Sequence, residues 1–517
     1  MRNNIGAYLG KRGHTNPNLE AIVDVATARR LTYAQVDRRA NKVANAMLNL
    51  GIKKGDRVAI LMMNSVEYFE SFMGLAKIGA VVVPLNWRLV ADELSYILKD
   101  AGAIAMIHGG EFGAVAAELH DRGPGSSGTD IRHWIELDEG NERNLFATAY
   151  EDFVAAGAES TPNGDAGEND DLFIMYTSGT TGLPKGALHT HNTMTWAIIT
   201  FANSTDIRIG DRYSIALPMF HVGALLPVLF TIYSGGTAVL LRQFDPKVMW
   251  EITEREKITS SLAVPAMLNF MLQVPEHEKY DTSNLRAILS GASPVPTSLI
   301  ERYKDIGIEI HQAYGLTEAG GPGTVLSPED AMVKIGSAGK AFFHTTVRIV
   351  DKDGNDTAPG VPGELLVSGA HIMKGYWNNP EATAEAIRDG WLYTGDIAFQ
   401  DEDGFVTIHD RVKDMIISGG ENVYPAEVEN IISSHPGVGD VAVIGQPSKR
   451  WGESPFAVVV KRDHDLTEAD ILQHCDGKLA RFKLPKGAVF IDEIPRNPTG
   501  KPLKRLLRDQ FPGPAPE

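Results

Sequence analysis

The sequence predicts an α/β protein in which a large N-terminal domain precedes a small C-terminal one. Apolar strand-like runs alternate with helical patterns in the N-terminal part, and this alternation is typical of parallel sheets covered by helices. A charge-free run lies between Arg212 and Arg242, as expected for strands that are buried on both faces of such a sheet. After Asp410 the mixed pattern returns over about 100 residues, which is enough chain for a second domain.

The first elements follow from local patterns. Thr32 and Gln35 fit a capping box, and apolar residues then recur at helical spacing until Gly51, so we expect a helix over residues 32–50. The next elements are predicted as a strand at 57–62, a helix at 66–77 and a strand at 80–83. This order predicts parallel strands with helical cover.

The charge-free run is long enough to cross a bilayer, because about 20 apolar residues suffice. Two prolines and the pair Gly235-Gly236 divide it. We therefore expect a strand at 213–217, a helix-length piece and a strand at 237–241, all inside a parallel sheet. The alternative, a membrane-spanning segment, is less well supported.

Several irregular segments connect the elements. Residues 121–130 and 155–170 are rich in Gly, Ser, Pro and Asp, which is typical of surface loops. From about residue 335 short strands alternate with Asp-x-Asp-Gly runs at 351–354 and 401–404, which we interpret as hairpin turns rather than calcium loops because no EF-hand pattern follows. Beyond Asp410 we expect helices at 425–433 and 467–480 and strands at 438–445 and 456–461.

Composition excludes several classes of protein. The chain has 517 residues, 43% of them apolar, and 49 Lys+Arg against 66 Asp+Glu give a net charge of −17. This charge repels nucleic acid. The single thiol, Cys475, cannot close an intrachain disulfide, and the polar start at residues 1–4 lacks the layout of a signal peptide. We therefore expect no nucleic-acid partner and a cytoplasmic location.

The clearest chemical motif is YTSGTTGLPKG at residues 176–186. It follows the apolar run 172–175, so it leaves the end of a strand, where α/β sheets bind ligands. Its glycines permit close backbone approach, its hydroxyls and backbone N–H groups can bind phosphate oxygens, and Lys185 adds positive charge. The order of residues is not that of a Walker A loop. A flexible linker is disfavoured by the buried strand before it.

This motif resembles the phosphate loop of the adenylate-forming superfamily, which includes acyl-CoA synthetases, luciferase-like enzymes and peptide-synthetase adenylation domains. Further motifs resemble that superfamily in the same order across almost the whole chain: SGAS at 290–293, YGLTE at 314–318, YTGD at 393–396, RVKD at 411–414, SGGEN at 418–422 and PTGK at 498–501. The chain most resembles the compact bacterial fatty-acyl-CoA ligases.

The resemblance implies a domain layout. Residues 1–410 would form an adenylation domain of layered α/β subdomains with a small β-barrel-like subdomain. Residues 411–413 would be a hinge with Lys413 as its pivot, and 414–517 a small mobile α+β domain. It also implies ATP, Mg²⁺ and CoA as the cofactor and co-substrates.

Residue roles are implied in the same way. Tyr314 would stack on adenine, Thr317 would contact the α-phosphate and Glu318 would hold Mg²⁺. Asp396 would accept hydrogen bonds from the ribose, helped by Arg411. The full set implied to hold ATP or AMP is Thr177, Ser178, Gly179, Thr180, Thr181, Gly182, Lys185, Gly291, Ala292, Tyr314, Gly315, Thr317, Asp396 and Arg411.

Lys501 is the implied catalytic lysine, bridging the carboxylate and the α-phosphate. Two unit charges about 4 Å apart repel by roughly 4 kcal/mol at an effective dielectric constant near 20, and Mg²⁺, Lys185 and Lys501 would offset this repulsion. A thiolate would then attack the acyl group. The implied CoA-binding residues are Gly419, Gly420 and Glu421, and rotation about Lys413 would exchange them with Lys501.

Three histidines lie near these motifs. His221 occupies the position where the superfamily has an aromatic residue or His beside the acyl group, which implies a gating or positioning role, with general base as the second reading. A buried core histidine is the alternative. His189 and His191 are interpreted as helix-surface or supporting residues.

The acyl pocket is expected to be apolar and without a cation for a second acidic group. Its expected lining is Phe220, His221, Val222, Ala224, Leu225, Val264, Gly320 and Gly321. Because the glycines of residues 320–323 are expected to leave space, a medium- or long-chain fatty acid is favoured. An aromatic acid of the cinnamate or benzoate type is the alternative, and a carrier-protein-loading enzyme or a non-catalytic nucleotide sensor is less well supported.

The remaining expectations concern partners. Basic pairs at 29–30, 38–39 and 53–54 are interpreted mainly as solvated faces, with weak peripheral contact to anionic lipid as the alternative. A homodimer is left open.

Overall fold

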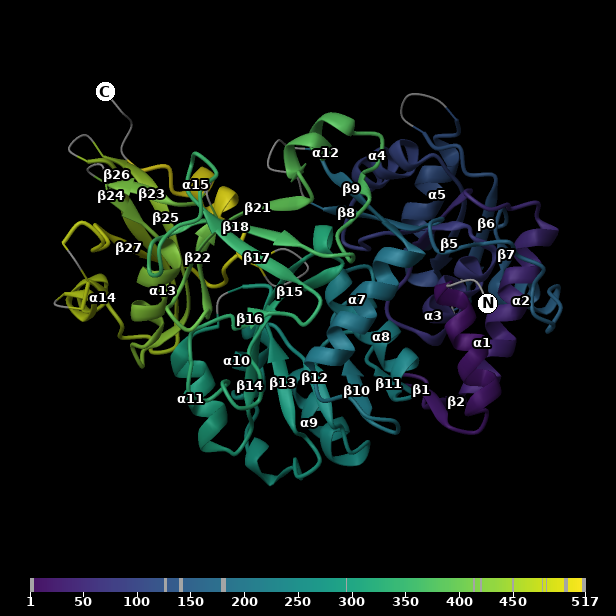
Figure 1. The fold of residues 1–517 in the computed structure, drawn as a ribbon, viewed down its shortest axis with the longest axis horizontal. Coiled ribbons are helices and arrows are strands. Elements are labelled where there is room, and N and C mark those ends of the chain that lie inside the picture. Colours follow the sequence, from purple (N-terminus) through teal and green to yellow (C-terminus); the bar gives the residue numbers. More distant parts are fainter. Residues whose placement is uncertain are drawn as a thin grey trace.

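A computed structural model describes residues 4–124, 128–138, 143–177, 183–293, 295–411, 414–418, 421–448, 451–476, 478–479, 481–496 and 501–513, and for 409–411 and 421–422 it describes the backbone alone. Within these residues the chain folds into two large sheets, a smaller antiparallel sheet and a C-terminal sheet. Figure 1 shows the N-terminal helices on one side of the molecule and the C-terminal sheet on the other.

The first large sheet has eight strands in the order β19-β9-β8-β4-β3-β5-β6-β7. Strands β8, β4, β3, β5, β6 and β7 are parallel, whereas β9 is antiparallel to β8 and β19 is antiparallel to β9. The strands are β3 (Arg57–Leu61), β4 (Val81–Pro84), β5 (Ala103–Gly109), β6 (His133–Leu137), β7 (Thr148–Ala149), β8 (Asp171–Thr177), β9 (Lys185–Thr190) and β19 (Gly375–Tyr376).

The second large sheet has nine strands in the order β16-β15-β14-β13-β12-β10-β11-β1-β2. The strands are β1 (Glu20–Asp24), β2 (Arg29–Thr32), β10 (Arg212–Ile215), β11 (Thr237–Leu240), β12 (Ser260–Leu262), β13 (Ala287–Ser290), β14 (Ile310–Leu316), β15 (Gly321–Val325) and β16 (Lys340–Ala341). The charge-free run forms β10, helix α8 (Val222–Ser234) and β11, and β10 pairs in parallel with β11. The core interpretation of this run is therefore confirmed.

Helices lie between the two large sheets and on their outer faces. Side chains of β3 show the layering, because Val58 and Ile60 belong to the large core with α1, α2, α3, α7 and α8, whereas Ala59 and Leu61 pack with α4 and α5. Alternation of this kind follows from the two-residue period of a strand. The helices are α1 (Ile5–Thr15), α2 (Tyr33–Asn49), α3 (Val66–Ile78), α4 (Ala91–Ala101), α5 (Gly113–Asp121), α6 (Tyr150–Ala155), α7 (His191–Ser204), α9 (Pro246–Arg255), α10 (Pro265–Met271) and α11 (Thr297–Asp305), with short 3₁₀ turns η1 (Gly110–Phe112), η2 (His277–Lys279) and η3 (Thr317–Ala319).

The predicted helix start at Thr32 is confirmed. The Thr32 hydroxyl accepts a hydrogen bond from the Gln35 amide, and the Gln35 side chain accepts one from the Thr32 amide at 2.8 Å. These two bonds satisfy amides that a helix start leaves without helical partners, so the sequence pattern alone fixes where α2 begins.

The smaller sheet is five-stranded and antiparallel. It contains β17 (Thr346–Val350), β18 (Gly363–Ser368), β20 (Ile387–Arg388), β21 (Trp391–Gln400) and β22 (Val406–Arg411), and α12 (Pro380–Ala386) precedes β20. The Asp351 carboxylate accepts bonds from the amides of Asp353 and Asn355, and Asp401 does the same for Asp403 and Phe405. Both carboxylates therefore stabilise turns, as predicted.

The C-terminal part has its own sheet and its own apolar core. It contains β23 (Ile416–Ser418), β24 (Glu421–Val423), β25 (Val438–Ser448), β26 (Gly452–Lys461), β27 (Ala488–Phe490), α13 (Pro425–Ser433), α14 (Glu468–Cys475) and α15 (Lys504–Gln510). The helix expected at 467–480 ends earlier, at Cys475, where Asp476 takes an extended conformation. This part contacts the large domain through the Asn269 amide and the Gly439 carbonyl at 3.3 Å, and through the Thr297 amide and the Asn430 side chain at 3.4 Å.

Two surface expectations can be compared with this fold. Among the described helices, none is long and apolar enough to cross a membrane. Of the six residues in the basic pairs, four form ion pairs with carboxylates: Arg29 with Glu67, Arg30 with Glu20, Arg39 with Glu70 and Lys54 with Asp165. Partners of opposite sign reduce the charge that these side chains could offer to anionic lipid.

Candidate active site

The predicted phosphate loop connects two paired strands. Thr177 at the end of β8 lies opposite Lys185 at the start of β9 in the antiparallel register. Thr177 and Lys185 therefore lie at the same end of these two neighbouring strands of the eight-stranded sheet. Ser178, Gly179, Thr180, Thr181 and Gly182 lie outside the described residues, so their predicted phosphate contacts stay predictions.

A carboxylate lies beside Thr177, the last described residue before this loop. The Glu318 Oε1 atom accepts a hydrogen bond from the Tyr376 hydroxyl at 2.9 Å and lies 3.5 Å from the Thr177 hydroxyl. The Lys185 ammonium lies 5.3 Å from the centre of the Tyr376 ring, within the range of a cation–π contact. The fold thus places together three predicted residues, Thr177, Lys185 and Glu318, although they come from different strands and turns.

Tyr376 is a site residue that the sequence analysis missed. It lies in the two-residue strand β19, which pairs with β9 so that Tyr376 is opposite Ala187. No periodic pattern predicts so short a strand, and its pairing with β9 is a long-range contact. The aromatic pair Tyr376-Trp377 between two turn-rich stretches is the one local pattern that could have drawn attention to it.

Glu318 is held by its backbone as well as by its side chain. It lies in η3, whose three carbonyls each accept a described hydrogen bond: Thr317 from His189 Nε2, Glu318 from the Met373 amide and Ala319 from His371 Nδ1, each at 2.8 Å. His189 and His371 are both fully buried. The reading of His189 as a surface residue is therefore wrong, whereas its reading as a supporting residue agrees with this contact.

Burial keeps these imidazoles neutral. It lowers the pKa of His189 to about 4, and it also lowers the pKa of His371. His191, at the start of α7, is buried as well, and its Nδ1 atom accepts a bond from the Ile5 amide at 3.1 Å. His191 thus supports the contact of α7 with α1 and does not lie on the helix surface.

The predicted ribose and adenine residues contact each other. The Tyr314 hydroxyl donates a 2.6 Å hydrogen bond to the Asp396 carboxylate, which is buried. The Asp396 amide in turn bonds to the Thr394 hydroxyl at 3.1 Å, which restrains the part of β21 that carries the carboxylate. Arg411 lies opposite Asp396 in the backbone register of β21 and β22, but its side chain is outside the described part of the structure.

Gly291 and Ala292 follow β13 next to Tyr314. A Cβ atom on Gly291 would lie 2.2 Å from the Ala313 carbonyl oxygen, so a side chain would not fit there. Ala292 has a positive φ of 68° and is exposed. The close approach of the two backbones beside an aromatic ring agrees with a flat slot.

His221 lies at the N-terminus of α8. Its ring packs 4.4 Å from the ring of Phe220, which contacts Trp87 edge to face at 6.1 Å. Burial, and to a lesser extent the charge of Arg88, lowers the pKa of His221 to about 3. Its Nε2 atom is buried and, among the described residues, has no hydrogen-bond partner. The His221 ring is therefore neutral and has one nitrogen without a partner among the described residues. Such a ring fits a positioning or gating role better than a charged imidazolium ring would.

The glycines expected to leave space for the acid do not do so. A Cβ atom on Gly321 would lie 2.6 Å from the Leu226 side chain, and one on Gly320 would lie 3.3 Å from His189. The absence of side chains at these glycines therefore makes room for neighbouring residues of the protein. The expectation that the glycines leave open space for the acid is wrong. Val222 also approaches Gly321, so this segment still packs against α8. Four other expected lining residues, Phe220, Ala224, Leu225 and Val264, are buried.

The C-terminal site residues are less completely described. Lys501 lies beside the bridge that pairs Arg496 with Pro502. Lys413, Gly419 and Gly420 are outside the described residues, and Glu421 is described only as a backbone position in β24. Their expected roles in the hinge, in CoA binding and, for Lys501, in catalysis stay predictions.

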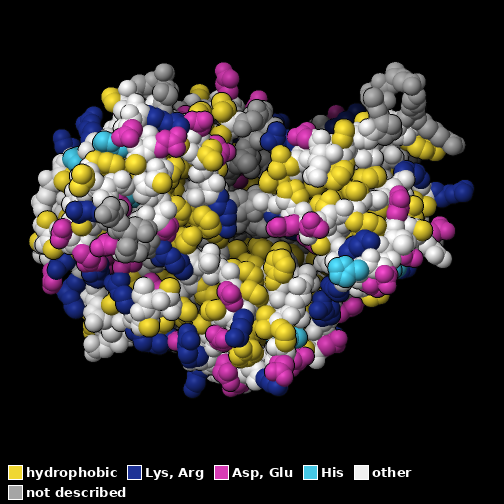
Figure 2. Space-filling model, turned by 180° about the vertical axis from the view of Figure 1, so that it is seen from behind, with side chains coloured by type: hydrophobic (Ala, Val, Ile, Leu, Met, Phe, Trp, Pro, Cys, Tyr) yellow, Lys and Arg dark blue, Asp and Glu magenta, His cyan; other side chains and the backbone are white. Residues whose placement is uncertain are grey.

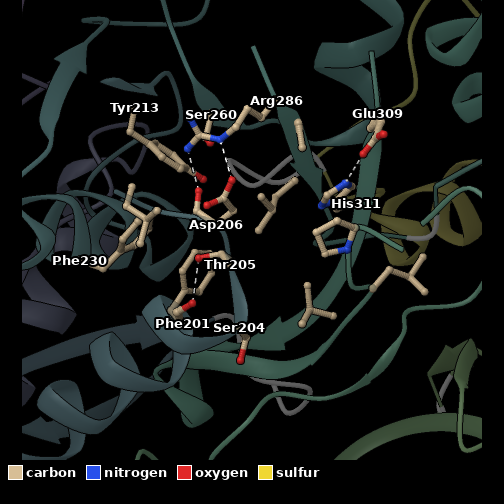
Figure 3. Close-up of a pocket in the computed structure, with 16 residues that line it drawn as sticks. Phe201, Ser204, Thr205, Asp206, Tyr213, Phe230, Ser260, Arg286, Glu309 and His311 are labelled. Atoms are coloured by element: carbon tan, nitrogen blue, oxygen red, sulfur yellow. Dashed lines mark hydrogen bonds and ion pairs between the residues drawn. The ribbon is translucent and has the colours of Figure 1, made fainter. Parts of the chain in front are cut away.

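A separate cavity of about 110 Å³ lies at the opposite end of the parallel strands (Figure 3). Polar pairs flank it: Arg286 with Asp206, and Glu309 with His311 at 3.0 Å. Its apolar wall includes Phe201 and Phe230. None of the expected acyl-lining residues is among its lining residues, so it is distinct from the predicted acyl pocket.

The donor set at Glu318 can be tested against Mg²⁺. Within the described part of the chain, no group of three or more His, Cys, Asp or Glu residues could hold a metal ion. Mg²⁺ commonly takes one or two carboxylates and completes its shell with water and substrate phosphates. The Glu318 carboxylate next to the Thr177 hydroxyl and the phosphate loop fits that arrangement.

Seen from behind, the molecule is hollowed between its two halves, and hydrophobic side chains gather below this hollow (Figure 2).

Comparisons with known proteins agree with this geometry. The family model "AMP-binding enzyme" matches residues 9–377, and "AMP-binding enzyme C-terminal domain" matches 427–501. The chain is 45% identical to "Long-chain-fatty-acid--CoA ligase FadD13" of Mycobacterium tuberculosis, over 99% of this chain and 100% of that protein. It is 41% identical to "Feruloyl-CoA synthase" of an Amycolatopsis species, again over 99% and 100%. The solved structure of anthranilate CoA ligase AuaEII with anthranoyl-AMP has a TM-score of 0.91 at 27% identity, over 99% of this chain and 97% of that one.

Proposed function

Because this chain belongs to the AMP-binding enzyme family as an AMP-forming acid–thiol ligase, we propose that it joins a medium- or long-chain fatty acid to CoA through an acyl-adenylate. One observation supports this reaction most directly: Thr177, Lys185 and Glu318 meet beside the phosphate loop, with Tyr376 in contact with both charged residues. Positive and metal-binding groups are what phosphoryl chemistry requires at that place.

In the first step a carboxylate oxygen of the acid bonds to the α-phosphorus of ATP and pyrophosphate leaves. Lys185 at the phosphate loop and Lys501 in the C-terminal domain offset the charge of the two anions. Tyr314 and Asp396 hold the adenosine, and Thr317 contacts the α-phosphate. Glu318, with the Thr177 hydroxyl beside it, would hold Mg²⁺, which would supply further positive charge for the phosphates.

In the second step the CoA thiolate bonds to the acyl carbon and AMP leaves. We assign the thiol path to Gly419, Gly420 and Glu421 and propose domains at 1–410 and 414–517 joined by a hinge at 411–413, with Lys413 as the pivot. The high TM-score against an adenylate-bearing ligase extends over both domains. We propose that the thiol step needs a second arrangement of the two domains.

The choice of acid rests on the pocket and on the relatives. The residues around α8 that we assign to the acyl pocket are apolar, apart from the neutral His221, and apolar walls favour an alkyl chain. The relative of 45% identity is named for long-chain fatty acids, which favours the same class. An aromatic acid is the second candidate because the relative of 41% identity is named for a feruloyl substrate.

A substrate panel tests the proposal. Purified enzyme with ATP, Mg²⁺ and CoA is given acids from octanoate to palmitate, and benzoate, cinnamate and ferulate. Pyrophosphate release and acyl-CoA formation are measured separately. We expect both products with the fatty acids. Activity confined to the aromatic acids would select the second candidate, and adenylate without thioester would point to a carrier-protein-loading enzyme. No pyrophosphate with any acid would leave the nucleotide-sensor reading.

Further proposals concern the protein's environment. We keep a cytoplasmic location, a homodimer and a weak peripheral membrane contact as predictions. The ion pairs of Arg29, Arg30, Arg39 and Lys54 weigh against an electrostatic membrane anchor. Co-sedimentation with anionic liposomes that declines with salt would support the anchor, and light scattering would give the oligomeric state.

A further inference from the structure

We propose that His189 and His371 are positioning residues for the metal–nucleotide site: they fix the turn η3 from both sides and so set the direction in which Glu318 presents its carboxylate. The inference rests on the proposed role of Glu318. It assigns a role to two residues that lie outside the site motifs, His189 in β9 and His371 in the segment after β18.

The first support is the hydrogen-bond pattern of η3. His189 Nε2 bonds to the Thr317 carbonyl and His371 Nδ1 bonds to the Ala319 carbonyl, each at 2.8 Å. These two carbonyls flank the residue that carries the carboxylate. A single 3₁₀ turn leaves most of its carbonyls without helical partners, so outside donors decide how it lies.

The second support is that each ring is oriented by another bond. A carbonyl oxygen can only accept, so the nitrogen that faces it must carry the proton. In each neutral ring the second nitrogen can then accept: His371 Nε2 lies 2.8 Å from the Thr345 hydroxyl and His189 Nδ1 lies 3.1 Å from the Thr193 hydroxyl. The two carbonyls therefore fix opposite tautomers, with the proton on Nε2 in His189 and on Nδ1 in His371.

The third support is close packing at the end of the turn. Gly320 has a φ of +65°, and a Cβ atom there would lie 3.2 Å from the His371 carbonyl oxygen and 3.3 Å from the His189 ring. The turn is thus enclosed by the two histidines. Both side chains are fully buried, so neither carbonyl can exchange its imidazole partner for bulk water without opening the structure.

The consequence concerns metal binding. The Tyr376 hydroxyl restrains the Glu318 carboxylate at its tip, and the histidines restrain its backbone. Residues that hold a metal ligand in place commonly change metal affinity by about 10- to 100-fold when they are replaced. We expect His189 and His371 to act in this way on Mg²⁺ without touching the metal or the nucleotide.

The test uses amide side chains that place a donor at one of the two ring positions. The Nε2 atom of Gln approximates His Nε2, and the Nδ2 atom of Asn approximates His Nδ1. His189→Gln and His371→Asn therefore retain the donor, whereas His189→Asn and His371→Gln displace it. The two amides differ in size but not in chemistry, so each position has its own matched control.

Metal affinity is measured directly, by electron paramagnetic resonance of Mn²⁺ titrated into enzyme with ATP and no acid. The Mg²⁺ dependence of pyrophosphate release is measured in parallel. We expect His189→Asn and His371→Gln to weaken Mn²⁺ binding about 10-fold or more and to raise the KM for Mg²⁺, with kcat at saturating Mg²⁺ largely retained. His189→Gln and His371→Asn should bind Mn²⁺ nearly as well as the wild type.

Two outcomes would overturn the inference: Mn²⁺ affinity unchanged in all four variants, or equal losses with both amides at each position, which would indicate a role in packing alone. His108→Leu, which removes another buried histidine bonded to the Gly109 carbonyl, should leave Mn²⁺ affinity unchanged. If the wild type shows no acid-dependent pyrophosphate release, the proposed function itself fails and the inference fails with it.

Discussion

Tyr376 contacts both charged groups of the candidate site, and its two contacts can be separated by substitution. Tyr376→Phe removes the hydroxyl that donates to Glu318 at 2.9 Å and keeps the ring that faces Lys185 at 5.3 Å. A hydrogen bond to a charged group contributes about 1.5 to 3 kcal/mol, and 1.36 kcal/mol corresponds to a tenfold change in rate. We therefore expect kcat/KM for adenylate formation to fall roughly 10- to 100-fold.

The assay is acid-dependent pyrophosphate release at fixed Mg²⁺. Tyr376→Leu should fall a further 2- to 5-fold or so, because a cation–π contact contributes about 0.5 to 1 kcal/mol. Tyr8→Phe is a matched control, since it removes a hydroxyl that bonds to Thr195 at 3.0 Å. It should leave the rate unchanged.

A Tyr376→Phe enzyme with wild-type kcat/KM would refute this reasoning, because the hydroxyl would then add nothing to the function of Glu318. Equal rates for Tyr376→Phe and Tyr376→Leu would refute the cation–π part alone. Circular dichroism of each variant would separate both results from misfolding.

Three further predictions follow from the same structure. Lys501→Ala should slow adenylate formation about 100- to 1,000-fold, as expected for loss of a group that stabilises developing charge, and should largely retain CoA transfer from preformed acyl-adenylate. Lys478→Ala is the control. Adenylate formation at full speed by Lys501→Ala would contradict the assigned role. Arg39→Ala should lower the free energy of unfolding in urea by about 3 to 5 kcal/mol, because the fully buried Glu70 carboxylate loses its bidentate partner. A loss below about 1 kcal/mol would mean that other groups compensate the Glu70 charge when Arg39 is absent. The free energy of unfolding should fall as the pH drops from about 7 to 4, because His189 takes up a proton near pH 6.5 in the unfolded state and near 4 in the folded state, where its pKa is lowered. The dependence of this free energy on pH should be weaker in His189→Gln. An equal dependence in both proteins would contradict the lowered pKa.

Much of the fold could be predicted because its elements are encoded by neighbouring residues. The capping residues at Thr32 start α2, and the helix expected at 425–433 has the observed bounds of α13. The run without charges forms a buried strand, helix and strand, as continuous apolarity predicts for a parallel sheet. In the site, the resemblance implied that Thr177 and Glu318 serve the phosphates and that Tyr314 and Asp396 serve the nucleoside, and the structure brings the residues of each pair together.

The rest depends on contacts between distant segments. Tyr376 and His371 contact η3 from strands and loops far along the chain, and no local pattern marks them. The Gly320-Gly321 pair was misread because a sequence shows that a side chain is missing but not which way it would point. Helix α1 was not predicted at all, since its three glycines lower helix propensity and packing against the core compensates.

The tight fit around Gly320 has a consequence for how this protein can change over time. A methyl group at residue 320 would crowd the ring of residue 189 and the backbone carbonyl of residue 371, so a side chain and a backbone atom together restrict this position to glycine. A smaller residue at 189 would remove one of these contacts, but the His371 carbonyl oxygen and the φ of +65° would still oppose a side chain at residue 320. Libraries that keep glycine at residue 320 should therefore contain more folded variants than libraries that vary it.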